Sequence, residues 1–526
     1  MNDNSKSSQG SGTEYDSDYE IGQSNVQMIG MDVHNPVFAI SAVSILFFII
    51  FALIFPADAN EMLTGARSWS IQTFDWLFMI GGNVFVLFCI ALIFLPVGKV
   101  RLGGKSAKTD FSTISWLSML FAAGMGIGLM FYSVAEPVAY YTDWWGTPLN
   151  AAPNTPEGAS AAMGATMFHW GLHPWAIYGV VALALCFFTY NKGLPLTIRS
   201  AFYPILGDRV WGPVGHVIDI VAVLATIFGL ATSLGLGASQ AAGGLNFLFG
   251  IDNNISTQIG IIVAVSAIAI FSVVRGLDGG VKLLSNINMS IAFALLMFVI
   301  FAGSVTAFLT NFFGILGSYA ENIVPLSNWI GREDEKFFHG WTVFYWAWWI
   351  SWSPFVGMFI ARISKGRTVR EFMLAVLVVP TLVSAVWMAA FGGSALDQIQ
   401  ANVGELSNGL GDVSLAMFQM LENLPLTEIT SLLAIILVLV FFITSSDSGS
   451  LVIDSITAGG KVDAPVPQRL FWAVLQGVIA GVLLYGGGSE ALTALQAGAV
   501  TVGLPFTVVL LCMCFSLYKG LKDEPR

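Results

Sequence analysis

The sequence predicts an all-α integral membrane protein with twelve transmembrane helices. Of its 526 residues, 56% are hydrophobic and only 10% are charged, a balance too apolar for an ordinary soluble domain. Apolar windows of about 20 residues, the length that crosses about 30 Å of hydrocarbon, recur along the whole chain. They fall around residues 36–56, 74–96, 113–134, 166–190, 212–239, 256–274, 285–313, 338–361, 372–392, 427–450, 470–487 and 491–517.

The basic residues indicate the orientation of these spans. Counted from the N-terminus, the loops on its own side hold every lysine and arginine except Arg67, Arg332 and Lys336. Because cytoplasmic loops carry the excess of Lys and Arg, we expect both termini to be cytoplasmic in a multi-pass protein of the cytoplasmic (inner) membrane. The agreement of all these loops supports the count of twelve spans as well as the orientation.

The predicted spans divide the chain into six regions. Residues 1–33 are polar and acidic, and we expect a disordered cytoplasmic tail there rather than a binding arm or a removable signal peptide. Two N-terminal spans, a first group of five and a second group of five follow, with an extracellular amphipathic segment between the groups and a short cytoplasmic tail at the end. The two N-terminal spans cover residues 34–112, and the first group of five covers 113–313. The amphipathic segment covers 314–337, the second group 338–517 and the final tail 518–526.

Two spans carry residues that disfavour a continuous helix. Span 3 has glycine at 124, 126 and 128, and each glycine costs about 1 kcal/mol of helix propensity relative to alanine. Close packing of helices is the alternative reading of these glycines. Span 8 carries Ser351-Trp352-Ser353-Pro354 at mid-membrane, where proline removes one backbone hydrogen bond. We therefore expect an interruption in both spans.

The two expected interruptions occupy corresponding positions. Span 3 opens one group of five helices and span 8 opens the other, and the two groups start from opposite sides of the membrane. Interrupted segments at matching positions of two inverted halves mark the binding site of a transporter. Their free amides suit an anion and their free carbonyls suit a cation.

Aromatic residues gather in the same two halves of the chain. Trp341, Tyr345, Trp348 and Trp352 form one stripe of span 8, with Trp346 and Trp349 beside it, and span 4 carries Trp170, Trp175 and Tyr178. An interfacial belt explains Trp69, Trp144, Trp145 and Trp341, which flank spans. It does not explain Trp175, Trp349 and Trp352, which lie near mid-span.

The deep rings favour an aromatic cage, with apolar packing of large side chains as the alternative. A quaternary ammonium cannot donate hydrogen bonds, so ring faces bind it, each contributing about 0.5 to 2 kcal/mol when desolvated. The cage predicts a small solute with a trimethylammonium or similar group.

Three motifs together carry a family resemblance. Gly124-Met125-Gly126-Ile127-Gly128, the set Trp170, Trp175 and Tyr178, and the run from Trp346 to Phe355 resemble the betaine/choline/carnitine transporter family, its sodium-coupled glycine betaine symporters in particular. The resemblance covers the chain from span 1 to span 12. It implies two inverted five-helix repeats (spans 3–7 and 8–12) of the leucine-transporter type plus two N-terminal helices. It also implies secondary active import of a compatible solute by alternating access, and a homotrimer.

The resemblance assigns roles to individual residues. Trp170, Trp175, Tyr178 and Trp349 would form the cage, and Trp348 and Trp352 would line the substrate path. The backbone of Gly124, Met125, Gly126, Ile127 and Gly128 would face the carboxylate of a zwitterion.

Span 10 predicts where a coupling ion binds. Thr444, Ser445 and Asp447 lie in or near the membrane, where an acid is a functional candidate by default. Hydroxyls bonded to their own helix would explain Thr444 and Ser445 but not Asp447. The resemblance implies a sodium site at Ala122, Met125, Phe441, Thr444 and Ser445.

A second sodium site implied by the resemblance is incomplete in this sequence. Thr226 and Phe355 match it, but Leu230 stands where a hydroxyl is expected, and Thr232 or Ser233, just beyond, offers a substitute only in a different helical phase. Span 5 has no Lys or Arg to replace sodium, so the sodium-independent exchangers of carnitine and betaine are the less suitable comparison.

The solute and the rival functions remain to be weighed. Gly128 replaces the acid that choline carriers tend to have there, which favours a zwitterion, glycine betaine first, with carnitine, choline, ectoine and dimethylsulfoniopropionate as alternatives. An enzyme is not expected, because His169 and His173 share a helix face without a third metal ligand. A channel would need rings of charge or carbonyls along a pore. The expected partners are the solute, sodium, the bilayer and further copies of the chain, with no nucleic acid and no cofactor besides sodium.

Overall fold

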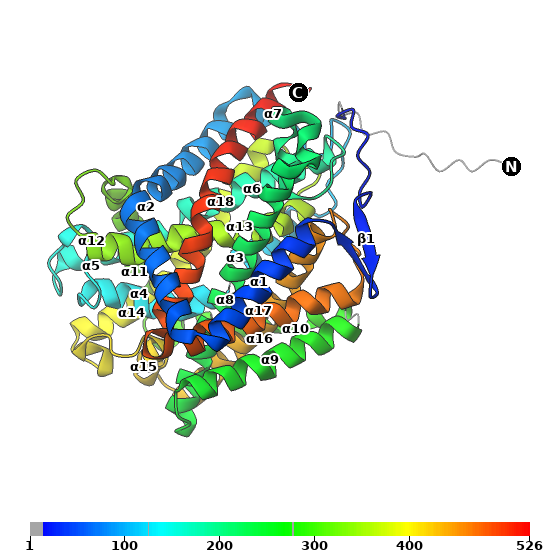
Figure 1. Cartoon of the computed structure of the whole chain (residues 1–526). Helices are drawn as coiled ribbons and strands as arrows, with labels where there is room; N and C mark the ends of the chain where they lie inside the picture. The colour runs from blue at the N-terminus through cyan, green and yellow to red at the C-terminus, as the bar shows by residue number, and fades with distance from the viewer. Residues whose placement is uncertain (1–13, 125, 276–277, 526) are drawn as a thin grey trace.

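The computed structural model describes residues 14–124, 126–275 and 278–525, and it is a bundle of helices with one small hairpin (Figure 1). The elements are β1 (Asn25–Met28), β2 (Met31–His34), α1 (Val37–Ile54), α2 (Pro56–Phe94), α3 (Thr113–Gly124), α4 (Ile127–Tyr141), α5 (Pro156–Trp170), α6 (Leu172–Tyr190), α7 (Tyr203–Leu206), α8 (Pro213–Phe249), α9 (Ile255–Arg275), α10 (Asp278–Ala302), α11 (Val305–Ser327), α12 (Glu335–Phe337), the π-helical turn η5 (Phe338–Val343), α13 (Phe344–Ile363), α14 (Val369–Gln400), α15 (Ala416–Glu422), α16 (Thr427–Thr457), α17 (Val466–Gly487) and α18 (Ala491–Lys522).

The helical membrane architecture predicted from the sequence is confirmed. In the part of the chain that the structure describes, nine helical runs are long and apolar enough to cross a membrane. Two of these runs join consecutive helices, α5 with α6 and α17 with α18. The predicted spans 3 and 8, which fold as α3–α4 and α13, are not among the nine, so the count of twelve stays a prediction.

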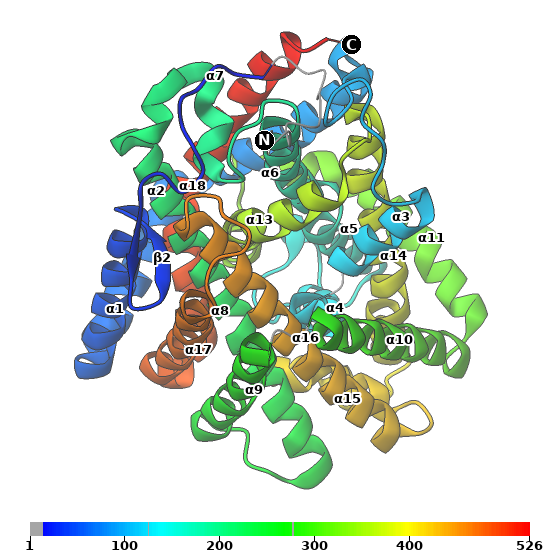
Figure 2. The same cartoon turned by 90° about the vertical axis from the view of Figure 1, so that its right-hand side faces the viewer.

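Helix α13 lies in the interior of the bundle (Figure 1, Figure 2). It packs against α6, α8 and α18, while α4 packs against α5, α8 and α14. Because α8 contacts both α4 and α13, the interrupted span 3 and the tryptophan-rich span 8 meet in the same region of the core.

The break predicted in span 3 is confirmed. Helix α3 ends at Gly124 and α4 begins at Ile127, with Gly126 in an extended conformation (φ −168°, ψ −179°). Met125 lies outside the described residues. Glycine weakens both helix ends here, as the sequence predicts.

The break predicted in span 8 is wrong, because α13 runs without interruption through Pro354. Proline at position 354 cannot donate to the carbonyl of Ile350, four residues earlier. The hydroxyl of Ser353 donates to that carbonyl instead, over 2.7 Å. The serine beside the proline therefore replaces the missing amide, and the helix continues.

Two predicted boundaries also differ from the structure. The expected loop before span 2 is helical, because α2 begins at Pro56, and only Phe74 departs from helical geometry (φ −130°). The amphipathic segment predicted at residues 314–337 coincides with α11 only as far as Ser327, and α11 already begins at Val305. The side chain of Ser304 caps α11 by accepting from the amide of Ala307 (3.2 Å), which ends the preceding span early.

The prediction of a disordered tail at residues 1–33 is wrong for residues 14–33. Strands β1 and β2 pair there as an antiparallel hairpin, and the ring of Tyr19 stacks on Trp211 with ring centroids 4.1 Å apart. Arg199 donates to the Tyr19 hydroxyl (2.8 Å), and Lys461 forms an ion pair with Asp32. The acidic and aromatic residues of this segment thus have partners on the bundle, which composition alone does not reveal. Residues 1–13 lie outside the described part.

The two described ends of the chain meet at one end of the bundle. Tyr15 donates its amide to the carbonyl of Lys192 (3.4 Å), and the ammonium of Lys192 pairs with Glu524 (2.5 Å). Helix α18 continues to Lys522, so most of the predicted tail 518–526 is helical.

The loops with most of the basic residues gather at this same end. The amide of Leu102 donates to the carbonyl of Arg367 (2.9 Å), and the amide of Gly103 donates to the side chain of Asn191 (2.7 Å). Lys519 donates to the carbonyl of Pro204 over 2.7 Å. Loops that the charge pattern assigned to one side of the membrane are therefore in contact.

His34 makes the attachment of the N-terminal hairpin sensitive to pH. Its buried ring accepts a hydrogen bond from Arg199 (3.1 Å), which requires a neutral imidazole, and the ring of His216 lies 5.3 Å away. Burial, followed by the positive charge of Arg199, lowers the pKa of His34 to about 3. A depressed histidine pKa means that the unfolded chain binds the proton first, so stability is lost as pH falls below the ordinary value.

We therefore expect the hairpin to detach as the pH falls from 7 to 5. Below the ordinary histidine pKa of about 6.5, each pH unit should cost the attached state about 1.4 kcal/mol. Hydrogen exchange of residues 25–34, corrected for intrinsic rates, should accelerate in the wild type. In His34→Gln, which can accept from Arg199 but does not titrate, protection should stay constant; parallel behaviour of the two proteins would contradict this role.

Candidate functional site

The break in span 3 exposes the N-terminal amides of α4. The first hydrogen bond of this helix runs from the amide of Met130 to the carbonyl of Gly126 (3.2 Å). The amides of Ile127, Gly128 and Leu129 precede it, where a helix offers no carbonyl partner. Gly126 and these three residues line a cavity inside the bundle. The amides of a helix N-terminus, at the positive end of the helix dipole, are suited to a carboxylate.

A second interruption, which the sequence did not reveal, shapes the aromatic side of this cavity. Helix α5 ends at Trp170 and α6 begins at Leu172, with Gly171 in a non-helical conformation (φ −100°, ψ −130°). A Cβ atom at Gly171 would lie 2.6 Å from the carbonyl oxygen of Met167, so no larger residue fits without a shift. Because of this break, Trp170 belongs to a different helix from Trp175 and Tyr178, and its direction does not follow from their helical spacing.

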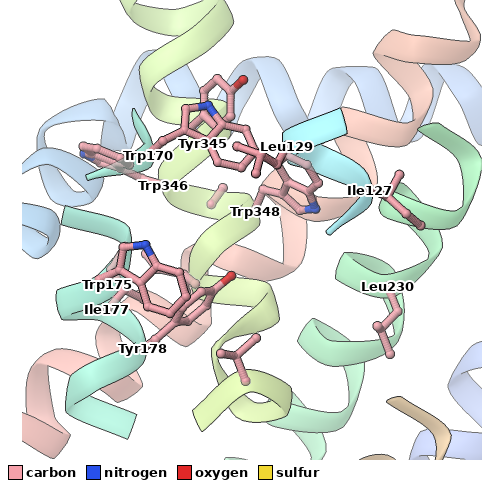
Figure 3. Packing of buried hydrophobic residues seen from close by; sticks show 14 of the residues in the cluster. Ile127, Leu129, Trp170, Trp175, Ile177, Tyr178, Leu230, Tyr345, Trp346 and Trp348 are labelled. Atoms are coloured by element: carbon pink, nitrogen blue, oxygen red, sulfur yellow. The ribbon is translucent and has the colours of Figure 1, made fainter. Parts of the chain in front are cut away.

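The four residues expected to form a cage come together. The Trp349 ring meets Trp170 edge to face at 4.9 Å between centroids and Tyr178 at 5.6 Å, and Trp175 meets Tyr178 at 5.4 Å. In Figure 3, Trp170 lies near Trp348 and Leu129, and Trp175 and Tyr178 lie together below them. All four rings line the same cavity as the α4 amides.

The indole nitrogens of the three span 8 tryptophans that line the cavity are hydrogen-bonded. Trp349 donates to the carbonyl of His169 (2.9 Å), and Trp352 donates to the carbonyl of Gly229 (2.9 Å). Trp348 donates to the hydroxyl of Ser233 over 3.2 Å. These bonds fix each ring by its edge, so the π faces remain available to a cation. Trp348 and Trp352, expected along the path, also line the cavity.

Gly128 lies against two rings of the site. A Cβ atom there would be 2.5 Å from Trp348 and 3.1 Å from Trp170, whereas a Cβ atom at Gly126 would meet nothing within 4 Å. The sequence analysis noted only that glycine at position 128 replaces an acid, but the absence of a side chain there has a second effect. It lets two indoles reach the start of α4.

A larger cavity adjoins the cage. It measures about 450 Å³, against about 40 Å³ for the cage cavity, and the two share Gly126, Trp352 and Val356. Ala122, Phe441, Thr444 and Ser445, four of the five residues expected at the first sodium site, line the larger cavity. The fifth, Met125, lies outside the described residues.

The hydroxyl of Thr444 bonds within its own helix, to the carbonyls of Val440 (3.0 Å) and Phe441 (3.2 Å). Its lone pairs can still accept a cation. Asp447, the coupling candidate, lies half-buried on α16 one residue before Ser448, which lines the larger cavity.

The structure does not complete the second sodium site. The hydroxyl of Thr226 donates to the carbonyl of Ala222 (2.7 Å) in its own helix, while Phe355 lines the larger cavity. Leu230 packs against α16, where a Cβ atom at Gly449 would collide with its side chain, and it offers no oxygen ligand. Figure 3 shows Leu230 on α8, apart from the cage rings.

The two substitutes considered for Leu230 have other partners. Thr232 donates to the carbonyl of Leu495 (2.8 Å) on α18, and Ser233 accepts from Trp348 at the cage. Both hydroxyls are therefore engaged away from Thr226.

The two histidines weighed as metal ligands have hydrogen-bonding roles. His173 lies 3.2 Å from the side-chain oxygen of Asn83, and His169 lies 2.8 Å from the carboxylate of Glu136. Within the described ranges, no cluster of three or more His, Cys, Asp or Glu side chains is placed to hold a metal ion.

Glu136 is the residue of this region that sequence reasoning missed. Its carboxylate also accepts from the indole of Trp170 over 2.7 Å. Span 3 was expected to end at residue 134, which placed Glu136 in a loop, but α4 continues to Tyr141 and buries it completely. An acid two residues past a predicted span is the signal that could have identified it.

Substituting Gly128 tests this packing. Gly128→Ala should displace Trp348 and Trp170 and lower the free energy of unfolding of the solute-free protein by about 1 to 3 kcal/mol. Gly126→Ala is the matched control, since its methyl group meets open space and its φ suits any residue. Thermal unfolding in detergent measures both. Equal stability of the two variants would show that Gly128 does not set the position of the rings.

Comparison with known proteins adds three findings. The model of the BCCT family, the betaine/carnitine/choline family transporters, matches residues 36–526. The chain is 64% identical to glycine betaine transporter 1 of Vibrio parahaemolyticus (96% of this chain, 97% of that one) and 63% identical to a glycine betaine/proline/choline/ectoine transporter of the same organism (96% and 90%). It is 43% identical to the glycine betaine transporter OpuD of Bacillus subtilis, over 93% of this chain and 94% of that one.

Proposed function

Because the chain belongs to the betaine/carnitine/choline transporter family, we propose that it imports a zwitterionic quaternary ammonium solute, glycine betaine first, coupled to sodium by alternating access. It is a membrane transporter rather than an enzyme, as are the family and its close relatives. The finer assignment of solute, ion and mechanism rests on the arguments below.

One observation carries the choice of a zwitterion. The first residues of α4, Ile127 to Leu129, and the rings of Trp170, Trp175, Tyr178 and Trp349 line the same cavity. The amides suit the carboxylate of the solute, and the ring faces suit a trimethylammonium group, which has no hydrogen to donate. Glycine betaine has these two groups one carbon apart, so a single molecule can satisfy both walls.

A broader range of solutes is the second candidate. The relative at 63% identity is named for proline, choline and ectoine as well as glycine betaine. Choline has no carboxylate and would leave the α4 amides without an anion. We therefore place choline below the zwitterions, and likewise carnitine and dimethylsulfoniopropionate below glycine betaine, for which two of the relatives are named alone.

The position of the hydroxyl-lined cavity supports sodium coupling. Ala122, Phe441, Thr444 and Ser445 line a cavity that shares Gly126 with the cage, and Thr444 and Ser445 carry hydroxyl groups. Hard oxygen ligands suit a hard cation. A sodium ion there would bind beside the same break whose amides receive the carboxylate, so ion and solute would stabilise one backbone conformation. This arrangement favours a sodium symporter over a sodium-independent exchanger.

The wider architecture follows the family expectation. We assign twelve spans to α1, α2, α3–α4, α5–α6, α8, α9, α10, α13, α14, α16, α17 and α18, the last ten as two inverted repeats, and expect a homotrimer. Contacts among the basic loops support a cytoplasmic location for both termini and, with it, a cytoplasmic-membrane protein.

The cage cavity is narrow in this conformation. It measures about 40 Å³ against about 450 Å³ for the cavity beside it, so we expect the rings to move apart when the solute enters. The wider cavity beside it, reached past Trp352, is the natural route to or from the site.

Reconstituted uptake tests this proposal. An inward sodium gradient should drive accumulation of labelled glycine betaine in proteoliposomes, and replacing sodium by potassium should abolish it. Ser445→Ala should raise the sodium concentration for half-maximal uptake by about tenfold, because a ligand to a buried ion contributes about 1.4 kcal/mol or more. Thr226→Ala, at the incomplete second site, is the matched control and should change little. Uptake indifferent to sodium would refute the coupling, and no uptake of betaine would refute the solute.

A further inference from the structure

A buried carboxylate lies directly behind the aromatic cage. Glu136 is in α4, nine residues after the start of that helix at Ile127, and no part of it is exposed. It does not line the cage cavity. It contacts instead the residues that hold the cage in place.

Four donors converge on this carboxylate from three helices. One oxygen accepts from the hydroxyl of Tyr140 (2.9 Å) and lies 2.8 Å from Nδ1 of His169. The other accepts from the hydroxyl of Tyr345 (2.6 Å) and from the indole of Trp170 (2.7 Å). Donors alone surround the group, which is the arrangement that an anion requires.

The ion pairs of the described residues give this anion no fixed positive charge as a partner. Glu136 pairs there with His169, and with neither a lysine nor an arginine. With Nδ1 donating to Glu136, a neutral His169 ring can accept from the hydroxyl of Thr342 at Nε2 (2.9 Å). Both ring nitrogens are thereby satisfied without a second proton, and the negative charge remains.

We propose that Glu136 is a positioning residue that gives the cage its preference for a cation, acting through the indole of Trp170. The proposal rests on the proposed function, because it assumes a quaternary ammonium in the cage. It adds a charge to a site whose lining side chains are neutral, and it defines a specificity determinant outside the cavity.

Two effects make the charge felt inside the cage. A hydrogen bond from the indole N–H to a carboxylate pushes electron density into the ring, and cation–π attraction grows with that density. The carboxylate also acts through space, where the surrounding protein screens it far less than water does. Trp170 touches Trp349 edge to face at 4.9 Å, so the polarised ring is part of the cage itself.

A purely structural role for Glu136 predicts something different. The residue joins α4 to Trp170 on α5 and Tyr345 on α13, so its loss could simply loosen the cage. In that case every ligand of the same shape would lose affinity equally. A role for the charge predicts that affinity is lost only for the ligand that carries a positively charged ammonium group.

Two ligands of the same shape separate these roles. In 3,3-dimethylbutanoate a carbon atom replaces the nitrogen of glycine betaine, which removes the positive charge and keeps the three methyl groups and the carboxylate. Binding to the purified full-length protein can be measured by tryptophan fluorescence, with the isostere also titrated in competition with betaine. In Glu136→Gln, the preference for betaine over the isostere should fall about tenfold, because the attraction for the charge is lost.

Tyr345→Phe is the matched control, since it removes one of the four bonds to Glu136 and keeps the charge. Its preference for betaine should stay within about threefold of the wild type. Trp170→Phe keeps a ring and removes the N–H link, so its preference should fall toward that of Glu136→Gln; it also provides the test if Glu136→Gln does not fold. If the isostere binds to no form of the protein, betaine affinity alone is compared between Glu136→Gln and Tyr345→Phe.

The outcomes are distinct. An unchanged preference in Glu136→Gln, or equal losses of betaine affinity in Glu136→Gln and Tyr345→Phe, would overturn the inference. A wild-type protein that binds no betaine would instead overturn the proposed function.

Discussion

The extended backbone at Gly126 is the constraint on which the rest of the site depends. A continuous helix through span 3 would pair the amides of Ile127, Gly128 and Leu129 with carbonyls one turn earlier, and the cavity would then have no donor for a carboxylate. Gly128 adds a second requirement, since Trp348 lies within 2.5 Å of where its Cβ atom would be. One short segment thus supplies the polar wall and admits an aromatic ring.

The aromatic wall depends on a different combination of broken and unbroken helix. Gly171 interrupts span 4 between Trp170 and Trp175, while α13 remains continuous and presents Trp348, Trp349 and Trp352 from one rigid element. Ser353 makes that continuity possible by replacing the amide that Pro354 lacks. Glu136 then joins the end of α5 to the continuous helix α13, because it accepts hydrogen bonds from Trp170 and Tyr345. Glu136 therefore contributes to the geometry of the cage and, in our proposal, also to its preference for a cation.

Features governed by local chemistry could be predicted from the sequence. Alternating glycines disfavour helix wherever they occur, so the break at Gly126 was predictable. The spacing along span 8 placed Trp348 and Trp352 on one helix stripe with Trp349 beside it, the family resemblance assigned all three to the substrate site, and all three line the cage cavity. The hydroxyls of span 10 line a cavity with Ala122. In each case the pattern lies within a single helix.

Features that depend on partners elsewhere in the chain could not be predicted from the sequence. One local feature was also missed: Pro354 predicted a break because the expectation for proline took no account of the adjacent Ser353, whose hydroxyl donates to the carbonyl of Ile350. The acidic segment before α1 looked disordered because its partners, Arg199 and Lys461, are distant in sequence. Glu136 was missed because an apolar window cannot tell where a helix ends when the next residues are buried by neighbouring helices.

The central claim is that one solute binds with its carboxylate at the start of α4 and its ammonium among the rings. A cryo-EM structure of the protein in glycine betaine and sodium tests it most directly. The account predicts solute density between the amides of Ile127 to Leu129 and the rings of Trp170, Trp175, Tyr178 and Trp349, with the methyl groups toward the rings. Density with the carboxylate toward the rings, or a solute bound outside this cavity, would contradict it.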